Sequence, residues 1–414
     1  MNLDPALLVR AVERRREEFV ADLATLVNVD CGSPNVAGVN TVGRWCARRL
    51  TELGFDVTVE PVRGSGGDPL GDCVWGRLAG RRRDGGRVLL MAHMDTVFDD
   101  GEAAARPFRV DGDRCHGPGV CDDKAGLLTG LYAVAALREM GFTDFGEIVF
   151  HCSPDEEIAS PGSRPVIERL AGDVDAALCL ECARENGDIV SARKGVADVE
   201  LEVTGRAAHA GVEPERGISA ALGAARLTVA LQALNGRWPG VTVNVGVLRA
   251  GTRYNVVPAR GYLSVDVRAH TVAGLDTALA EIDRTATDPG LAGCMVSVRA
   301  SGCHPTWERD PGTAALVDLA RDAGRDVGVP VRDAATGGAA EANLTAALGV
   351  PTLDGLGPVG GDDHGPAEWV DLSSVVPRVA LLAGLIARIT RATRSTWVGG
   401  ATTTNQSARA TQPT

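Results

Sequence analysis

Apolar and charged positions repeat along the chain at periods that predict alternating helices and strands. Residues 7–27, 39–53 and 124–140 place apolar side chains at helical spacing. Short runs rich in Val, Ile, Leu and Cys predict strands at 56–60, 73–78, 87–92, 147–151 and 176–180. Near-continuous apolar strands between helices indicate an α/β fold, with a mostly parallel sheet covered by helices on both faces.

The pattern changes between residues 194 and 304. An alternating strand precedes a helix near 217–234, and two strands, a helix and a last strand follow. This βαββαβ order predicts an α+β domain inserted into the larger one. The larger predicted domain therefore has two parts, residues 1–193 and 305–396. Residues 397–414 are polar and aperiodic, which predicts a disordered tail.

Composition and charge exclude several classes of partner. The net charge is −12 and the basic residues form small groups rather than a stripe, so nucleic acid is not expected as a partner. Residues 1–20 lack the apolar block of a signal peptide, and we find no apolar run of about 18 residues elsewhere, so no membrane is expected either. Ten cysteines without regular spacing indicate a reducing compartment, hence a cytoplasmic location.

Acidic and histidine side chains directly follow three of the predicted strands. They are His93, Asp95, Glu156, Glu157 and Glu181. Ligands of open α/β sheets bind beyond the carboxyl ends of the strands, so we expect these side chains to lie together. Asp122 and His364 lie in two further segments that pair acidic residues or an acid with histidine.

This set supplies the donors for two zinc ions per subunit, with cobalt as a possible substitute. A dinuclear site needs one bridging carboxylate and about two further ligands for each ion. The predicted ligands are His93, Asp122, Glu157, Glu181 and His364, with Asp122 as the bridge. Asp95 can accept the second ring N–H of His93. Glu156 lies beside a ligand without being one, which is the expected place of a general base for hydrolysis.

Two other interpretations compete with a metal-dependent hydrolase. Ser191 and Lys194 fit a Ser-x-x-Lys pattern, but the Ser-Asp-Asn and Lys-Thr-Gly elements of serine acyl-enzymes are missing. The second alternative is a non-hydrolytic protein that binds carboxylate ligands or acts as a scaffold while keeping the fold. Metal content separates it from the enzyme, because such a protein would bind its ligand without metal.

The segments resemble the dinuclear zinc aminoacylases and carboxypeptidases, a family that includes glutamate carboxypeptidase, acetylornithine deacetylase and succinyl-diaminopimelate desuccinylase. The resemblance rests on His-Met-Asp-Thr-Val from His93, Gly-Pro-Gly-Val-Cys-Asp-Asp-Lys-Ala-Gly at 117–126 and Ser-Pro-Asp-Glu-Glu at 153–157. It implies a zinc-exopeptidase-like fold, in which His93 and Glu181 hold one zinc and Glu157 and His364 the other. It also implies hydrolysis of an amide bond next to a free carboxylate in a small molecule.

The resemblance assigns further roles within the inserted domain, which it identifies as a lid and dimerisation domain of a homodimer. His209 would reach the active site of the partner subunit and stabilise the oxyanion. Asn255 and Arg268 would hold the substrate carboxylate, for which an arginine fork is suited. Gly337 and Gly338 would line the substrate pocket.

Two segments depart from the family pattern. The sequence Gly-Cys-His-Pro that contains His304 stands where glutamate carboxypeptidases carry an additional arginine, which argues against glutamate specificity. After Gly337 and Gly338, the family commonly has Thr or Ser and then Asp, whereas this chain has Ala340 and Glu341. The substrate therefore stays open between a dipeptide, an N-acyl amino acid and a specialised metabolite.

Overall fold

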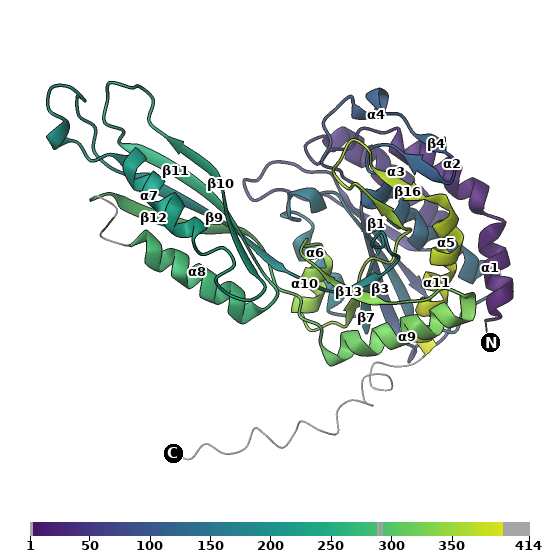
Figure 1. Ribbon diagram of the computed structural model, residues 1–414. Helices are drawn as coiled ribbons and strands as arrows, with labels where there is room; N and C mark the ends of the chain where they lie inside the picture. Colours follow the sequence, from purple (N-terminus) through teal and green to yellow (C-terminus); the bar gives the residue numbers. More distant parts are fainter. Residues whose placement is uncertain (1–2, 288–289, 291–292, 392–414) are drawn as a thin grey trace, which may run out of the picture. The chain divides into compact units, whose positions relative to one another are not determined.

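The structure is a computed structural model that describes residues 3–287, 290 and 293–391 (Figure 1). The predicted tail at 397–414 lies outside these residues. The chain forms two compact units. Ala192–Glu308 and Thr336–Asn343 form unit 2, and the other described residues form unit 1. The predicted inserted domain at 194–304 falls within unit 2.

A six-stranded sheet in the order β1-β2-β6-β3-β7-β14 forms the centre of unit 1. Its strands are β1 (Asp56–Glu60), β2 (Cys73–Ala79), β3 (Arg87–His93), β6 (Glu147–Ser153), β7 (Ala176–Cys179) and β14 (Thr352–Leu353). β3 pairs in parallel with β6 and β7, and β7 with β14, whereas β2 is antiparallel to both of its neighbours. The sheet is therefore mixed and mostly parallel, which confirms the predicted fold class.

Both faces of this sheet are covered. Val88–His93 are all buried in β3, and because successive side chains of a strand point to opposite faces, neither face of the sheet is open to solvent there. The principal helices of unit 1 are α1 (Pro5–Glu13), α2 (Arg16–Val27), α3 (Val36–Glu52), α5 (Gly126–Glu139), α6 (Arg164–Ala171), α9 (Pro311–Val327) and α11 (Leu372–Arg391). The prediction of one helix over 7–27 is wrong. The helix is broken at Arg14 and Arg15, and both arginines pair there with Glu139.

Helix α11 corrects the expectation that the chain has no long apolar run. Among the described residues it is the one helix long and apolar enough to cross a membrane, yet 78% of its apolar window is buried inside the protein. Arg378 in this helix is buried and donates hydrogen bonds to the carbonyls of Gly355 and Gly357. The burial and these contacts identify α11 as a core helix of unit 1.

Unit 2 is an antiparallel sheet in the order β10-β11-β9-β12 with two helices packed on it. The elements follow the chain as β9 (Gly195–Thr204), α7 (Ala220–Gln232), β10 (Val241–Ala250), β11 (Arg260–Ala269), α8 (Val272–Ala286) and β12 (Met295–His304). Val199, Leu201 and Val265 are among the alternate strand residues buried in the core with α7 and α8. The observed order matches the predicted βαββαβ unit.

The buried His151 of β6 makes the stability of unit 1 depend on pH. Its ring nitrogens have no hydrogen-bond partner among the described residues, and burial lowers its pKa to about 3. An unfolded histidine has a pKa of about 6.5, so the unfolded state binds the extra proton between these two values. The stability that the neutral ring permits is present above pH 6.5 and is lost as the pH falls toward 3.

We therefore expect the free energy of unfolding to fall more between pH 7.5 and 5.0 in the wild type than in a His151→Leu variant. The difference should be about 2 kcal/mol, since each pH unit below 6.5 costs about 1.4 kcal/mol. Urea denaturation at both pH values measures it, and other titrating groups cancel in the comparison. Equal losses in the two proteins would contradict this role of His151.

Candidate metal centre

The five predicted ligands lie together at the carboxyl end of the unit 1 sheet. His93 is the last residue of β3, Glu157 follows β6, and Glu181 follows β7. Asp122 lies in the turn before α5, and His364 comes from a loop before α11. Because β3, β6 and β7 are parallel, their ends deliver these side chains to one edge, as the sequence predicts.

Asp122 lies between the two histidines. Its Oδ1 is 2.8 Å from Nε2 of His93 and its Oδ2 is 3.1 Å from Nε2 of His364. Glu157 Oε2 is 3.2 Å from the same His364 nitrogen, and Glu181 Oε1 is 3.7 Å from Nε2 of His93. Each imidazole thus faces the shared Asp122 and one glutamate of its own.

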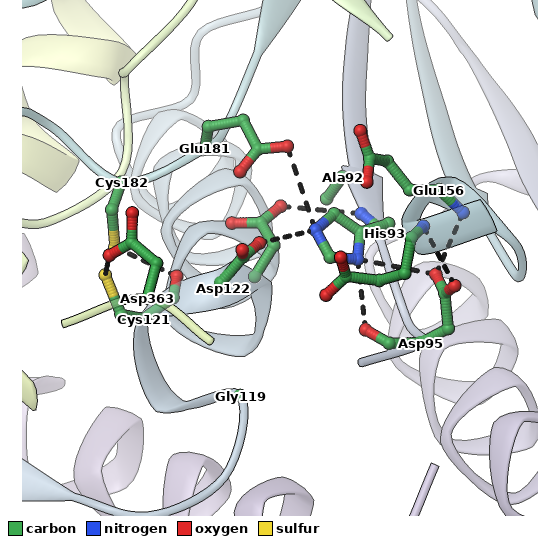
Figure 2. Close-up of polar contacts among 12 residues, drawn as sticks. Ala92, His93, Asp95, Gly119, Cys121, Asp122, Glu156, Glu181, Cys182 and Asp363 are labelled. Atoms are coloured by element: carbon green, nitrogen blue, oxygen red, sulfur yellow. Dashed lines mark hydrogen bonds and ion pairs between the residues drawn. The ribbon is translucent and has the colours of Figure 1, made fainter. Parts of the chain in front are cut away.

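Asp95 lies beside Nδ1 of His93, on the side of the ring opposite Asp122 (Figure 2). Nδ1 of His93 is 3.0 Å from the Asp95 backbone carbonyl and 3.4 Å from the nearest carboxylate oxygen. The carboxylate instead accepts the Ser33 hydroxyl at 2.6 Å and the backbone N–H groups of Glu156 and Glu157 at 3.1 and 3.2 Å. The main-chain carbonyl and the carboxylate of Asp95 therefore both face Nδ1 of His93, and the carbonyl lies closer.

Neighbouring carboxylates raise the pKa of both histidines. Burial lowers the pKa of His93, but hydrogen bonds to Asp122 and Asp95 outweigh it and raise this pKa well above its ordinary value. Hydrogen bonds to Asp122 and Glu157 raise the pKa of His364 to about 10. Burial raises the pKa of Asp122, yet the two imidazoles outweigh that effect and lower it. Metal binding would have to remove any proton on the ligating ring nitrogens, because a histidine ligand must be neutral.

The environments of Glu181 and Glu157 suit a divalent cation. Burial, followed by the charge of Asp122, raises the pKa of Glu181 well above its ordinary value. Burial also raises the pKa of Glu157, whose Oε1 has no hydrogen-bond partner among the described residues. Ligand atoms of His93, Asp122 and Glu157 all lie within 4.8 Å of one another. Buried like charges of this kind need compensation, and imidazole with carboxylate is a donor set that zinc accepts.

Glu156 opens the short helix Glu156–Ile158, so it comes from the same turn as Glu157. The Asp95 carboxylate fixes the backbone of both residues. After burial and the nearby aspartates, the charge of Glu156 also contributes to the raised pKa of Glu181. Glu156 therefore lies close enough to the predicted ligands for its charge to affect the pKa of Glu181.

The His364 loop has an unusual backbone. His364 has a φ of 62° and Asp362 a φ of 58°, both in the left-handed region. The Arg106 guanidinium donates to the carbonyls of Gly365 and Pro366 at 3.3 and 3.0 Å. These contacts hold the loop at the residues that directly follow the histidine.

His209 and Asn255 lie next to each other in unit 2. The Ala210 N–H donates to the Asn255 carbonyl at 3.1 Å, and His209 forms a β-bridge with Val256. Both His209 and Asn255 are exposed. Nδ1 of His209 accepts the Gly211 N–H at 3.1 Å.

Arg268, Gly337 and Gly338 form a second group in unit 2. Arg268 Nη1 donates to the Gly337 carbonyl at 3.1 Å, and its Nε donates to the Asp266 carboxylate at 3.0 Å. The Gly338 carbonyl accepts from Arg193 at 3.2 Å. The half-exposed Arg268 side chain is therefore anchored at two of its nitrogens.

Glu368 is a buried residue near the site that is not among those predicted from the sequence. This side chain is 1% exposed and binds the backbone of the segment that carries Asp122. One glutamate in a loop shows no period. Its position four residues after His364 is the only signal that could have drawn attention to it.

Comparisons with known proteins identify the family of the chain. Residues 89–388 match Peptidase family M20/M25/M40. Carboxypeptidase G2 of Pseudomonas sp. is 33% identical over 386 residues, which cover 92% of this chain and 91% of that protein. Acetylornithine deacetylase of Myxococcus xanthus is 29% identical over 254 residues, which cover 58% of this chain and 63% of the relative.

Solved structures show the same fold. A tripeptidase from Staphylococcus aureus has a TM-score of 0.78 at 20% identity, covering 91% of this chain and 99% of its own. An M20 family metallo-carboxypeptidase from Sulfolobus solfataricus has a TM-score of 0.71 at 16% identity, covering 90% and 99%. The fold, the family match and the carboxypeptidase relative lead to one conclusion: the chain belongs to Peptidase family M20/M25/M40 and is a metal-dependent amide hydrolase.

Proposed function

We propose that the protein uses two zinc ions per subunit to hydrolyse an amide bond next to a free carboxylate in a small molecule. The supporting observation is the paired arrangement around Asp122, in which each imidazole faces this carboxylate and one glutamate. His93 and Glu181 would hold one ion and Glu157 and His364 the other, with Asp122 shared between them. Cobalt would substitute for zinc at the same donors.

When bound, the ions supply Lewis acidity to the amide carbonyl and acidify water. Glu156 takes a proton from the attacking water and later gives it to the leaving amine. The Asp95 carboxylate accepts the backbone N–H of Glu156 at 3.1 Å. This hydrogen bond fixes the main-chain position from which the Glu156 side chain extends. Asp95 is thus a positioning residue for the base as well as for His93.

Arg268 and Asn255 would hold the substrate carboxylate, with Gly337 and Gly338 at the pocket wall. The support is the anchoring of Arg268 by Asp266 and Gly337, which reduces the entropy lost when an anion binds. Relatives named carboxypeptidase and acetylornithine deacetylase support both a carboxypeptidase and an N-acyl-amino-acid deacylase. Both reactions cleave an amide beside a free carboxylate.

Metal removal and a substrate panel test this function. We expect about two zinc ions per chain, loss of hydrolysis after chelation, and recovery with zinc or cobalt. Dipeptides and N-acyl amino acids should be cleaved, and their carboxamide analogues about 100-fold less efficiently, because an arginine left without its anion is costly. Metal-free protein that still binds a carboxylate ligand without hydrolysing anything would instead support the non-hydrolytic alternative.

We also propose a homodimer through unit 2, in which His209 stabilises the oxyanion in the active site of the partner subunit. Val212, whose N–H donates to the His209 carbonyl, and Tyr254, which precedes Asn255, are both exposed, and exposed apolar side chains are typical of interfaces. Mixing inactive His209→Ala and Glu156→Gln proteins should restore activity, since the hybrid dimer contains one intact site. Mixing without recovery would contradict the exchange of His209, and a fully active monomer in light scattering would contradict the dimer.

A further inference from the structure

Glu368 accepts hydrogen bonds from three backbone N–H groups in the segment that ends in Asp122. Its Oε1 accepts the N–H groups of Cys121 at 2.7 Å and Asp122 at 3.0 Å, and its Oε2 accepts that of Gly119 at 2.9 Å. The side chain is almost fully buried. Hydrogen bonds from N–H groups to a carboxylate are stronger than those between neutral groups. Both oxygens of Glu368 therefore bind main-chain N–H groups of this one segment.

The segment that it binds needs such an acceptor. Gly119 has a φ of 69°, and Asp122 has φ −112° and ψ 92°, so regular helical geometry is interrupted here. Gly119 and Cys121 are buried. Without the carboxylate, their N–H groups would lie away from water and unsatisfied, which is costly.

Glu368 is fixed from its own side as well. It lies four residues after His364, and its carbonyl is 3.1 Å from Nδ1 of His116. The next residues form β16 (Trp369–Asp371), which pairs with β5 (Arg114–His116). One side chain therefore joins the segment of Asp122 to the segment of His364, two residues whose side chains lie 3.1 Å apart.

We propose that Glu368 is a positioning residue that sets the direction of the bridging Asp122 through its main chain. The proposal rests on the proposed function only in that Asp122 and His364 bind metal. Asp122 must present one oxygen to each side of the cluster, and the three hydrogen bonds fix the backbone from which its short side chain departs. Glu368 thus governs metal affinity without touching metal or substrate.

A Glu368→Gln variant tests this role because it keeps the size of the side chain and replaces one acceptor oxygen by an NH2 group. We expect zinc affinity, measured by competition with a chelating dye, to fall about 10- to 100-fold, as for other residues that support metal ligands. The visible absorption of the cobalt-loaded protein should change, and kcat should fall more than KM rises. Glu368→Asp keeps the charge but shortens the reach, so it should show a smaller loss and gives the answer if the glutamine variant does not fold.

Asp310→Ala is the control, because it removes a carboxylate that also binds the main chain but lies at a helix cap. Asp310 also accepts a backbone N–H, that of Thr313 at 2.6 Å, but it caps helix α9. This variant should lose unfolding stability while keeping zinc affinity and the cobalt spectrum. If the folded Glu368 variants behave in the same way, Glu368 is merely structural and the inference is overturned. A wild type that binds no zinc would overturn the proposed function too, which separates the two failures.

Discussion

Replacing Glu156 by glutamine should abolish turnover while both metal ions stay bound. Glutamine keeps the shape of the side chain but cannot accept the proton of the attacking water, and general acid–base catalysis contributes about 10²–10⁴-fold. The Asp95 hydrogen bond to residue 156 uses the backbone N–H and is unaffected by the change. We expect kcat to fall by about that factor, measured together with zinc content on the same preparation.

The adjacent Glu157→Gln is the matched control, since it changes the same functional group one residue away. Glu157 lies 3.2 Å from His364, so this variant should lose zinc as well as activity. Near-wild-type turnover in Glu156→Gln would sink its assignment as the base. Loss of zinc in both variants would show instead that Glu156 is a ligand.

Replacing Asp122 by alanine should have the second largest effect, on metal binding and activity together. Both carboxylate oxygens face a histidine, so both proposed ligand sets lose a member. A ligand that binds only the folded state stabilises it by about 2.7 kcal/mol at 100 times its Kd. We expect zinc to raise the unfolding free energy of the wild type by an amount of this order and that of the variant by much less.

Thermal unfolding with and without zinc measures this difference. Asp363→Asn provides the control, because Asp363 directly precedes His364 and its Oδ1 is 3.5 Å from the Cys121 sulfur, but it is not a proposed ligand. The control should keep the stabilisation by zinc. An undiminished response in Asp122→Ala would rule out the bridging role.

The part of the site that follows from the sequence is the part delivered by strand ends. His93, Glu157 and Glu181 each follow an apolar run, and parallel strands carry whatever follows them to one edge. His364 lies in a loop without such a rule, and its placement next to Asp122 rested on the resemblance and on the choice of donors. Glu368 could not be predicted from the sequence, because its three hydrogen bonds go to main-chain N–H groups and hydrophobic periodicity does not report such contacts.

In the fold too, elements that depend on local patterns were predicted, and features that depend on distant contacts were not. Alternation of buried and exposed residues in β9 and β11 was sufficient to predict the sheet of unit 2. The break between α1 and α2 was missed, since the apolar period continues across it while its arginines pair with Glu139, far away in the sequence. Helix α11 was misjudged for a related reason, because the carbonyls that satisfy Arg378 lie in other segments of the chain.

The left-handed backbone at Asp362 and His364 limits how the metal preference of this enzyme can be altered by directed evolution. A non-glycine residue in that region is destabilised by roughly 1–2 kcal/mol, a cost that glycine avoids. Asn and Asp adopt this backbone more often than β-branched residues do. A library at position 364 is therefore best restricted to Asp, Asn and His, which combine a donor atom with tolerance of this backbone. Threonine at this position would lower the stability of the folded loop whatever its affinity for a metal, because its β-branched side chain is disfavoured in the left-handed region.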